Sequence, residues 1–313
     1  MNRFNLKIFK RFWAIAKLYW FGEEKRGALV LLGLLGVLLL GYTQLSVILN
    51  AQQGGLISAL SAKDEPRFWE AVGVFLGVLI VYVPLFAGYG YLRDKLGLFW
   101  RRWLTNHFLG QYFSNRSFYD LGNSNAEIDN PDQRISEDIR SFSQESLRFL
   151  LIIIGSILQV IAFSGVLWGI SKPLVIFLVI YAFGGTIITT GFFGRRLVKL
   201  NFDQLKKEAN FRFGLVRIRE NAESIAFYQG ENQESKRVSN RFTEVFRNFN
   251  LLIVWQELYL GLFTNTYEFM LYIIPAVILA PSVFSGDFEV GKVTEAQGAF
   301  FRVFYSLNII VSR

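Results

Sequence analysis

The sequence predicts an all-α membrane protein, a six-helix transmembrane bundle with long cytoplasmic helical extensions. Of its 313 residues, 52% are hydrophobic and only 19% are charged, below the roughly 25% that is usual for a soluble domain. The apolar residues are also grouped in runs, and most runs reach the roughly 20 residues that a helix needs to cross a bilayer. The six predicted spans are 27–49, 70–92, 149–170, 173–192, 251–280 and 298–313.

The distribution of Lys and Arg predicts which side of the membrane each segment occupies. Seven lie in residues 1–26, eight in 93–148 and twelve in 193–250, whereas the remaining loops carry one or two each. Since Lys and Arg are enriched in cytoplasmic loops, the N-terminus and both long charged segments are predicted to be cytoplasmic. Topology therefore explains the net charge of +8, and no nucleic-acid partner is predicted.

The Cys and His content restricts the chemistry that this chain can perform. The sequence has no Cys and a single His, His107. This composition excludes disulfides and thiolate metal sites and disfavours a histidine metal site or a Ser-His-Asp triad. We therefore predict no metal site, and the chain carries no catalytic motif.

Residues 1–26 are predicted to form an N-terminal interfacial elbow helix. The string RFNLKIFKRFWAIAKLYW (3–20) mixes Lys and Arg with Phe, Ile and Trp, as helices that lie in the membrane interface do. A cleavable signal peptide is not predicted, because the apolar run begins only at Gly27 and exceeds the usual 7–15 residues. Without a eukaryotic targeting signal, a bacterial inner membrane is the predicted location.

The second span is predicted to continue into the cytosol as one helix up to about residue 116. No Pro interrupts this segment, and about 24 residues at 1.5 Å each would extend it by roughly 36 Å. Turn-forming residues follow in FYDLGNSNAEIDNP, and a new helix is predicted to begin there. Asn130 would cap this helix, Pro131 would occupy its first position, and Gln133, after Asp132, would complete a capping box.

The same plan is repeated after the fourth span. A basic helix is predicted over 195–217, a short element over 219–229, and a returning helix over 231–250. The two charged segments, 93–148 and 193–250, are of nearly equal length and are predicted to lie on the same side of the membrane. Such a pair of helical segments indicates a mechanical connection to a cytosolic component, and hence a role in transport.

Two glycine pairs lie inside the apolar runs. Gly73–Gly77 and Gly165–Gly169 both have the GxxxG spacing that brings membrane helices into close contact. We therefore predict close helix packing at both pairs.

Several polar residues of the fifth span are predicted to line a translocation cavity. Glu257, Gly261, Thr264 and Glu268 occupy offsets that fall on one face of a helix. A carboxyl group in contact with lipid is costly, so Glu257, Thr264 and Glu268 are expected to face a cavity. Arg302 is the other charge within a span, but its position nearer the outer face does not favour a pair with Glu268.

Two strings in the charged segments resemble the cytoplasmic signatures of one ABC-transporter subfamily. They are EIDNPDQRISEDIRSF (127–142) and ENAESIAFYQGENQE (220–234), and FSGDFEVGKVTEAQGAF (284–300) is similar to the family's last extracytoplasmic loop. The subfamily contains the peroxisomal fatty-acyl-CoA half-transporters and the bacterial BacA-like permeases for peptides and cobalamin. The resemblance covers nearly the whole chain and implies a transmembrane domain of the ABC exporter type over 27–313.

The resemblance implies that the second string is an EAA-like motif that contacts a nucleotide-binding domain. The matching residues are Glu223, Ala226, Phe227, Tyr228 and Gly230. A short helix with this composition exposes aromatic side chains, its acidic start favours the positive helix end, and its final glycine can terminate it. In the alternative interpretation, the aromatic residues pack on the long helices of a partner subunit.

The role of the first string is less specific. The family motif covers Asn130, Pro131, Asp132 and Gln133, and the same four residues are also what a simple helix start requires. The nearby acidic residues do not form a catalytic pair, because solvated acidic runs are common on helices.

The chain lacks the motifs that bind ATP. No GxxxxGK[ST] phosphate loop and no LSGGQ-like signature occurs in the sequence. The nucleotide-binding domain is therefore predicted to be absent from this chain, and ATP and Mg²⁺ to bind through a fused or separate domain. The resulting prediction is a permease, truncated or split from its ATPase, that works as a homodimer because one six-helix half cannot enclose a translocation path.

Two other functions remain open at this stage. Some BacA-like relatives lack an ATPase and are driven by protons, and Glu257 and Glu268 could relay protons in such a permease. The EAA-like string argues against this alternative, because a permease without an ATPase does not need that surface. The chain could also be a non-transporting membrane scaffold or fragment. The solute, whether peptide, cobalamin-like or acyl-CoA-like, is not specified by the sequence.

Overall fold

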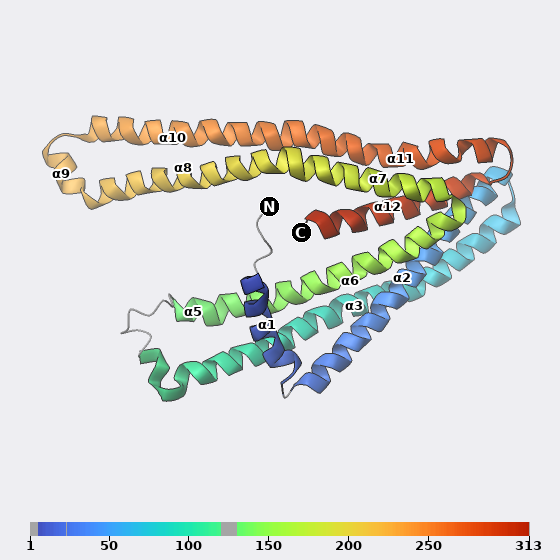
Figure 1. Cartoon of the computed structure of the whole chain (residues 1–313), viewed down its shortest axis with the longest axis horizontal. Helices are drawn as coiled ribbons and strands as arrows, with labels where there is room; N and C mark the ends of the chain where they lie inside the picture. Colours follow the sequence, from blue (N-terminus) through green and yellow to red (C-terminus); the bar gives the residue numbers. More distant parts are fainter. Residues whose placement is uncertain (1–5, 23, 120–129, 313) are drawn as a thin grey trace. The chain divides into compact units, whose positions relative to one another are not determined.

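The computed structural model describes residues 6–22, 24–119 and 130–312, and every regular element within them is helical (Figure 1). The main helices are α1 (Leu6–Trp20), α2 (Lys25–Ala62), α3 (Glu65–Phe113), α5 (Pro131–Gln133), α6 (Ile139–Ile170), α7 (Lys172–Ile188), α8 (Arg195–Glu220), α9 (Ala222–Phe227), α10 (Glu231–Ile253), α11 (Gly261–Phe284) and α12 (Val290–Ser312). The predicted all-α fold class is confirmed.

Five helices in the described residues are long and apolar enough to cross a membrane. They are Lys25–Ala62, Glu65–Tyr119, Pro131–Ile170, Lys172–Glu220 and Glu231–Phe284. α3 alone has 49 residues, or roughly 74 Å of helix, far more than the roughly 30 Å of a hydrocarbon core. The second apolar run therefore continues as one helix into the charged segment, but this helix ends at Phe113 and not at about residue 116, because Asn115 and Arg116 have positive φ. α12 is not among the five, because charged and amide side chains lower its hydropathy.

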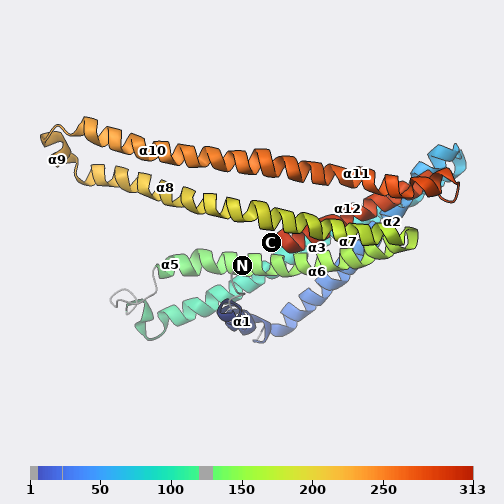
Figure 2. The ribbon, with the colours of Figure 1, turned by 45° about the horizontal axis from the view of Figure 1, so that its top comes forward.

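The chain forms two compact units. The first contains residues Met1–Ile170 and Ser282–Arg313, and the second contains residues Ser171–Pro281. In the first unit α2 packs against α3 and α12, and α6 packs against α12 and α3 (Figures 1 and 2). In the second unit α8 and α10 run side by side, and α9 joins their far ends.

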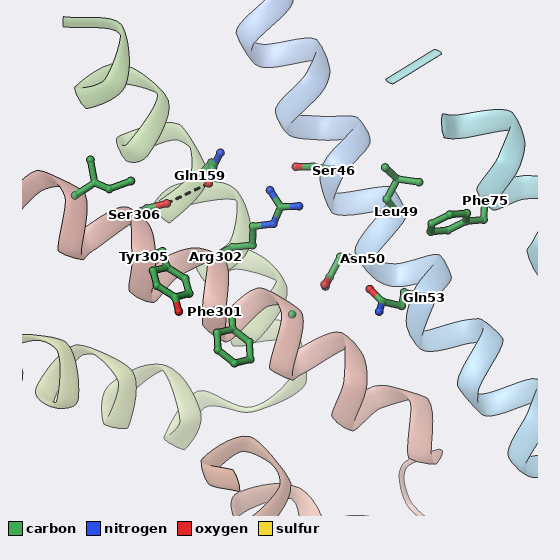
Figure 3. Close-up of a pocket in the computed structure, with 12 residues that line it drawn as sticks. Ser46, Leu49, Asn50, Gln53, Phe75, Gln159, Phe301, Arg302, Tyr305 and Ser306 are labelled. Atoms are coloured by element: carbon green, nitrogen blue, oxygen red, sulfur yellow. Dashed lines mark hydrogen bonds between the residues drawn. The ribbon is translucent and has the colours of Figure 1, made fainter. Parts of the chain in front are cut away.

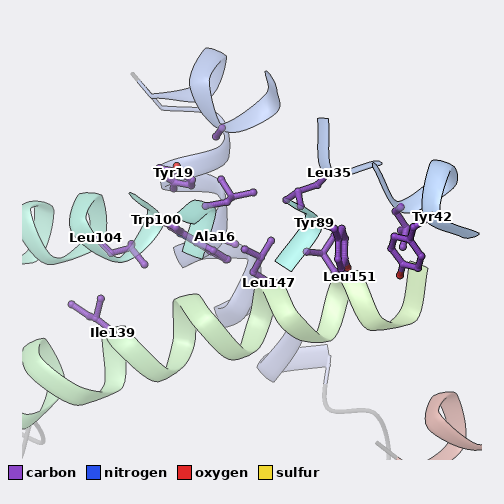
Figure 4. Close-up of a cluster of buried hydrophobic side chains, with 13 residues drawn as sticks. Ala16, Tyr19, Leu35, Tyr42, Tyr89, Trp100, Leu104, Ile139, Leu147 and Leu151 are labelled. Atoms are coloured by element: carbon purple, nitrogen blue, oxygen red, sulfur yellow. The ribbon is translucent and has the colours of Figure 1, made fainter. Parts of the chain in front are cut away.

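The core of the first unit forms where α1, α2, α3 and α6 meet. Hydrophobic side chains from all four helices are buried there (Figure 4), among them Ala16, Tyr19, Leu35, Leu39, Trp100, Leu104, Leu147 and Leu151. α1 contributes mainly aromatic rings: Tyr19 stacks on Trp100 with ring centroids 5.9 Å apart, and Trp20 meets the same indole edge-on at 5.5 Å. The elbow helix predicted in residues 1–26 is thus held by packing on α3. Burial raises the pKa of Tyr19 to about 12, so its hydroxyl stays neutral.

The closest helix contact of the first unit joins α2 to α12. A Cβ on Gly54 would lie 2.7 Å from the carbonyl oxygen of Gly291, and a Cβ on Gly291 would overlap the Gly54 carbonyl. Asn50 Nδ2 donates to the Glu295 carbonyl at 2.8 Å, and the Gly291 amide donates to Ser58 Oγ at 3.2 Å. These two glycines therefore allow the backbones to approach, and buried polar bonds then hold them together.

The predicted packing at the GxxxG pairs is wrong. A Cβ on any of Gly73, Gly77, Gly165 or Gly169 would meet no atom within 4 Å. The close approach occurs instead between two glycines that are far apart in the sequence, Gly54 and Gly291. The local spacing identifies small residues on one helix but does not show which helix faces them.

An ion pair joins the first residues of α3 to the residue that precedes α12. Arg67 binds Glu289 through two parallel hydrogen bonds of 2.9 and 2.8 Å. These bonds, with a further one from Ser58, lower the pKa of Glu289 to about 2. The carboxylate therefore remains ionised in any physiological medium.

We expect Gly291→Ala to destabilise the protein, because its methyl group would force α2 and α12 apart. Overpacking of this kind costs about 1–3 kcal/mol. Gly165→Ala is the matched control, since the same methyl group enters open space there. Heat-induced aggregation of the detergent-solubilised protein, followed by size-exclusion chromatography, should show a lower midpoint for Gly291→Ala only. Equal midpoints for the two variants would contradict the close contact.

We expect the stabilisation by Arg67–Glu289 to depend on pH in one direction. A carboxylate with a lowered folded-state pKa stabilises the fold fully above its unfolded value of 4.5. The contribution then declines as pH falls from 4.5 and vanishes below about 2. The difference in unfolding midpoint between the wild type and Glu289→Gln should therefore be constant from pH 6 to 8 and shrink in acid. A difference that grows in acid would refute the assignment.

Candidate functional site

The short helix α9 lies at the tip of a long two-helix arm in the second unit. α8 leads to it and α10 leads away from it, and both figures show these two helices side by side and antiparallel (Figures 1 and 2). The predicted boundaries of 195–217, 219–229 and 231–250 agree with the observed helices to within a few residues. The predicted coupling residues therefore lie together at one end of the arm.

The backbone at the end of α9 has the hydrogen bonds of a Schellman motif. The Gly230 amide donates to the Ile225 carbonyl at 2.9 Å, and the Gln229 amide donates to the Ala226 carbonyl at 3.2 Å. The left-handed residue of this motif is Gln229, with φ of 53°, and Gly230 follows it with φ of −86°. The Gly230 amide makes the last hydrogen bond of this motif, at the position called C″. Glycine is usual at the left-handed position itself, but here that position, one residue earlier, is occupied by Gln229.

The outer surface of α9 is aromatic and exposed. The side chains of Phe227 and Tyr228 are 81% and 80% exposed, and their rings meet edge-to-face at 5.2 Å. Ile225 is half-buried beneath them, and Glu223 and Ala226 are exposed beside them. Glu223 lies in the first turn, where its negative charge is favourable. The five predicted residues thus include an apolar patch whose burial would require a partner.

Polar contacts hold the two helices of the arm together. Near α9, Arg217 forms an ion pair with Glu234, which also receives Arg237 at 3.7 Å. Farther along, the buried Asn248 donates from Nδ2 to the Leu200 carbonyl at 3.0 Å and to Gln204 Oε1 at 2.8 Å. Because these contacts fix the register of α8 against α10, the arm can carry a displacement of α9 along its length.

Each side of the arm contains a π-helical segment where it joins the apolar helix. These segments, Thr189–Gly194 and Val254–Leu260, contact each other, and Phe192 lies 6.2 Å from Trp255. Arg196 packs over the same indole at 5.2 Å. π-segments are frequent at functional sites, because the extra residue shifts the helix and frees a backbone carbonyl. Periodicity did not predict either segment, since one extra residue is hidden within a long apolar run.

The first motif begins a helix, but the predicted capping box is wrong. Asn130 is the N-cap residue and Pro131 the first helical residue, as predicted, yet Asn130 has φ of 51° and makes no side-chain cap bond. Gln133 Nε2 instead points forward to Glu137 Oε2 at 3.5 Å. A left-handed N-cap aims its side chain away from the helix amides, so the reciprocal bonds cannot form. The turn that precedes the motif, 120–129, lies outside the described residues.

The predicted cavity residues of the fifth span lie in two differently wound parts of the helix. Glu257 is in the π-segment and exposed, and its Oε1 accepts a 3.1 Å bond from Gln256. Thr264 and Glu268 are half-buried in α11, and Thr264 Oγ1 donates to the Gly261 carbonyl at 3.3 Å. A π-turn takes about one residue more than an α-turn, so Glu257 is rotated away from the face that carries Thr264 and Glu268.

Tyr181 and Tyr267 join the apolar helices α7 and α11 of the second unit. Their rings stack at 4.3 Å, Tyr181 Oη donates to the Tyr267 carbonyl at 2.8 Å, and Tyr267 Oη donates back to the Tyr181 carbonyl. Gly185 leaves room for the Tyr267 ring, which a Cβ would overlap. Glu268 follows this clamp directly, so its backbone position is fixed.

A polar cavity in the first unit was not predicted. It lies among α2, α3, α6 and α12, has a volume of about 540 Å³ and contains Arg302 (Figure 3). The sequence identified Arg302 as a charge within a predicted span. It did not predict that Asn50 and Gln159 lie beside Arg302, because these residues come from other helices, far apart in the sequence. Among the described residues, no three His, Cys, Asp or Glu side chains come together to hold a metal ion.

Comparison with known proteins supports these structural observations. Residues 15–284 match a family described as ABC transporter transmembrane region 2. Over 286 residues, 91% of this chain, it is 45% identical to an uncharacterized ABC transporter ATP-binding protein of Synechocystis sp., of which it covers 43%. It is 37% identical over 97% of its length to the chloroplastic ABC transporter D family member 2 of Arabidopsis thaliana, again covering 43% of that protein.

A third relative is named for its solute. The chain is 29% identical over 91% of its length to the lysosomal cobalamin transporter ABCD4 of Homo sapiens, and it covers 46% of that protein. The chain thus spans less than half the length of each of these relatives.

Proposed function

This chain belongs to the ABC transporter transmembrane region 2 family, and on that premise we propose that it is the permease of an ATP-driven transporter. It moves a hydrophobic or amphipathic solute across the membrane through the cavity of a homodimer. The exposed aromatic pair Phe227–Tyr228 at the tip of the arm is the observation that carries this proposal. ATP and Mg²⁺ bind to a nucleotide-binding domain, and no residue of this chain is assigned to them.

The topology has six spans with a cytoplasmic N-terminus. α12 is the sixth span, and its polar residues are accommodated by contacts with α2 and α6 rather than by lipid. The excess of Lys and Arg in 1–26, 93–148 and 193–250 puts these segments, and with them α9, on the cytoplasmic side. A relative from Escherichia coli, 27% identical over 96% of this chain, is named an inner membrane ABC transporter ATP-binding protein, which supports a bacterial inner membrane as the location.

Coupling takes place at α9. Glu223, Ala226, Phe227, Tyr228 and Gly230 contact the nucleotide-binding domain, because an exposed aromatic patch on a charged cytoplasmic arm gains most from burial against a protein surface. The helix start Asn130–Gln133 lies in the other Lys- and Arg-rich segment, 93–148, and thus on the same cytoplasmic side as α9. Movement of the nucleotide-binding domain displaces α9, and the arm transmits the displacement as a rigid body to its π-segments.

The translocation path lies between two copies of the chain. One six-helix chain cannot enclose a translocation path. Both units also leave large apolar side chains exposed, which a second copy could cover. Glu257, Thr264 and Glu268 line the path, since a carboxylate facing lipid is costly. The solute is cobalamin-like, acyl-CoA-like or a peptide, as the resemblance of the two cytoplasmic strings implies, and the human relative is named a cobalamin transporter.

Proton-driven transport is the second candidate function. Glu268 is half-buried in an apolar helix, and it makes no ion pair with any residue that the structure describes. A carboxyl group in that setting can exchange a proton during transport.

Single-cysteine cross-linking tests the coupling site directly. The chain has no Cys, so Phe227→Cys introduces one thiol at the tip of the arm. In the complete transporter we expect this thiol to cross-link to the nucleotide-binding domain, because α9 is buried against it. Phe202→Cys is the matched control, because Phe202 is also exposed, at 67%, but lies on α8, and it should not cross-link to that domain. Cross-links from Phe227→Cys that join only two copies of this chain would reject the coupling site.

Glu268→Gln separates the two candidate energy sources. If ATP drives transport, the variant should alter the rate or affinity for solute at least a few-fold while transport still requires ATP, since a lining carboxylate has been removed. If protons drive it, the variant should abolish accumulation that depends on the pH gradient. Solute uptake into proteoliposomes with and without ATP, and with and without a pH gradient, distinguishes the outcomes. Wild-type uptake in all four conditions would exclude Glu268 from the path.

A further inference from the structure

The cavity around Arg302 combines one charge, several amides and an aromatic wall. Figure 3 shows Arg302 extending from α12 into the space between α6 and α2. Amide side chains line the cavity from α2 and α6, and aromatic rings line it from α3 and α12; the residues used below are Asn50, Gln159, Phe75, Phe301 and Tyr305. A site of about 540 Å³ with this lining can take a ligand that has one polar end and one apolar end.

Three helices place polar side chains at similar distances from their ends. Arg302 is 12 residues from the start of α12, Asn50 is 12 residues from the end of α2, and Gln159 is 11 residues from the end of α6. At 1.5 Å per residue, these positions lie about 16–18 Å from the helix ends. Arg302 is the fifth residue of the predicted span 298–313 and Asn50 directly follows the predicted span 27–49, so the cavity lies nearer the outer face of the membrane than its middle.

The charge of Arg302 is not neutralised by the residues that the structure describes. Its guanidinium packs over the Phe163 ring at 5.6 Å, and no ion pair involves it in the described ranges. The acid nearest to it along α12, Glu295, already binds Lys292 at 2.7 Å. A guanidinium within a predicted membrane span is costly, so a protein retains it where the charge has a use.

The neighbouring amides leave hydrogen-bonding capacity in the cavity. Gln159 Oε1 accepts a 3.1 Å bond from Ser306 Oγ, which orients its Nε2 away from that bond, and this nitrogen has no partner among the described residues. Asn50 is held by its bond to the Glu295 carbonyl. Arg302 and Gln159 together therefore present donors, and the cavity lining contains no Asp or Glu.

We propose that this cavity binds the carboxylate or phosphate group of an amphipathic anion. Arg302 binds the two anionic oxygens through its parallel N–H groups, and Gln159 donates a further hydrogen bond. The apolar body lies against Phe75, Phe301 and Tyr305. This inference rests on the proposed transport function, which it narrows to anionic amphipaths. The anion is either a transported solute or the head group of a phospholipid.

The test compares three probes that share a 12-carbon chain: dodecyl phosphate, dodecanol and dodecyltrimethylammonium. Binding to the complete transporter is measured by calorimetry in phosphatidylcholine nanodiscs without ATP. We expect the wild type to prefer dodecyl phosphate over dodecanol by at least about 10-fold, the effect of one charge-assisted pair. Arg302→Gln should lose this preference, and Arg302→Lys should keep only part of it, because Lys cannot form the bidentate pair.

Lys63→Gln is the matched control, because it removes one positive charge at the end of α2, outside the cavity. It should retain the wild-type preference. No anion preference in the wild type, or an unchanged preference in folded Arg302→Gln, would overturn the proposal. If Arg302→Gln does not fold, Arg302→Lys decides: full wild-type preference in that variant rejects bidentate recognition.

Mass spectrometry of the purified transporter separates the two sources of the anion. A phospholipid that co-purifies with the wild type and is absent from Arg302→Gln would show that the site holds a lipid head group. Uptake of dodecyl phosphate that is lost in the same variant would show that it holds the solute. Binding without any uptake by the complete transporter would leave the site intact and contradict the transport function. Uptake without anion preference would contradict this inference alone.

Discussion

The pairing of α8 with α10 is the constraint on which the proposed mechanism depends. Both helices are rich in charged and amide residues, so apolar burial alone cannot hold them in register. The ion pair Arg217–Glu234 near α9 and the buried bonds of Asn248 to Gln204 and Leu200 fulfil this role. With the register fixed, α9 is held at a defined distance from the apolar helices of the second unit, and its two aromatic side chains are exposed.

A different constraint organises the first unit. Gly54 and Gly291 let the backbones of α2 and α12 touch, and this contact brings polar residues of the two helices to one depth. Asn50 bonds across the contact, and Arg302 lies two turns farther along α12, beside the cavity. Close packing and ligand chemistry are therefore linked, since a larger residue at either glycine would also displace the polar lining.

The sequence predicted the helices well because apolar runs and charge asymmetry are local properties. It also placed α9, because a short aromatic helix between two charged ones is visible in the string 220–234. Pairings between distant helices were not predictable: Gly73 and Gly165 have the spacing of a contact and face open space, whereas Gly54 and Gly291 make one. Backbone detail was also missed. Gln229, not glycine, adopts the left-handed conformation, and the π-segment Val254–Leu260 interrupts the helical period that the pattern of Glu257, Thr264 and Glu268 assumed.

In the proposed mechanism a rigid arm carries motion from α9 to the membrane, and charge reversal at the Arg217–Glu234 pair tests this most directly. Arg217→Glu alone brings two acids together and should separate the tips of α8 and α10, so that ATP hydrolysis no longer supports solute uptake. Adding Glu234→Arg restores an opposite-charge pair with its polarity inverted. The account predicts that uptake per ATP hydrolysed falls at least several-fold in the single variant and returns toward the wild-type value in the double variant. Normal coupling in a folded Arg217→Glu protein would contradict the account.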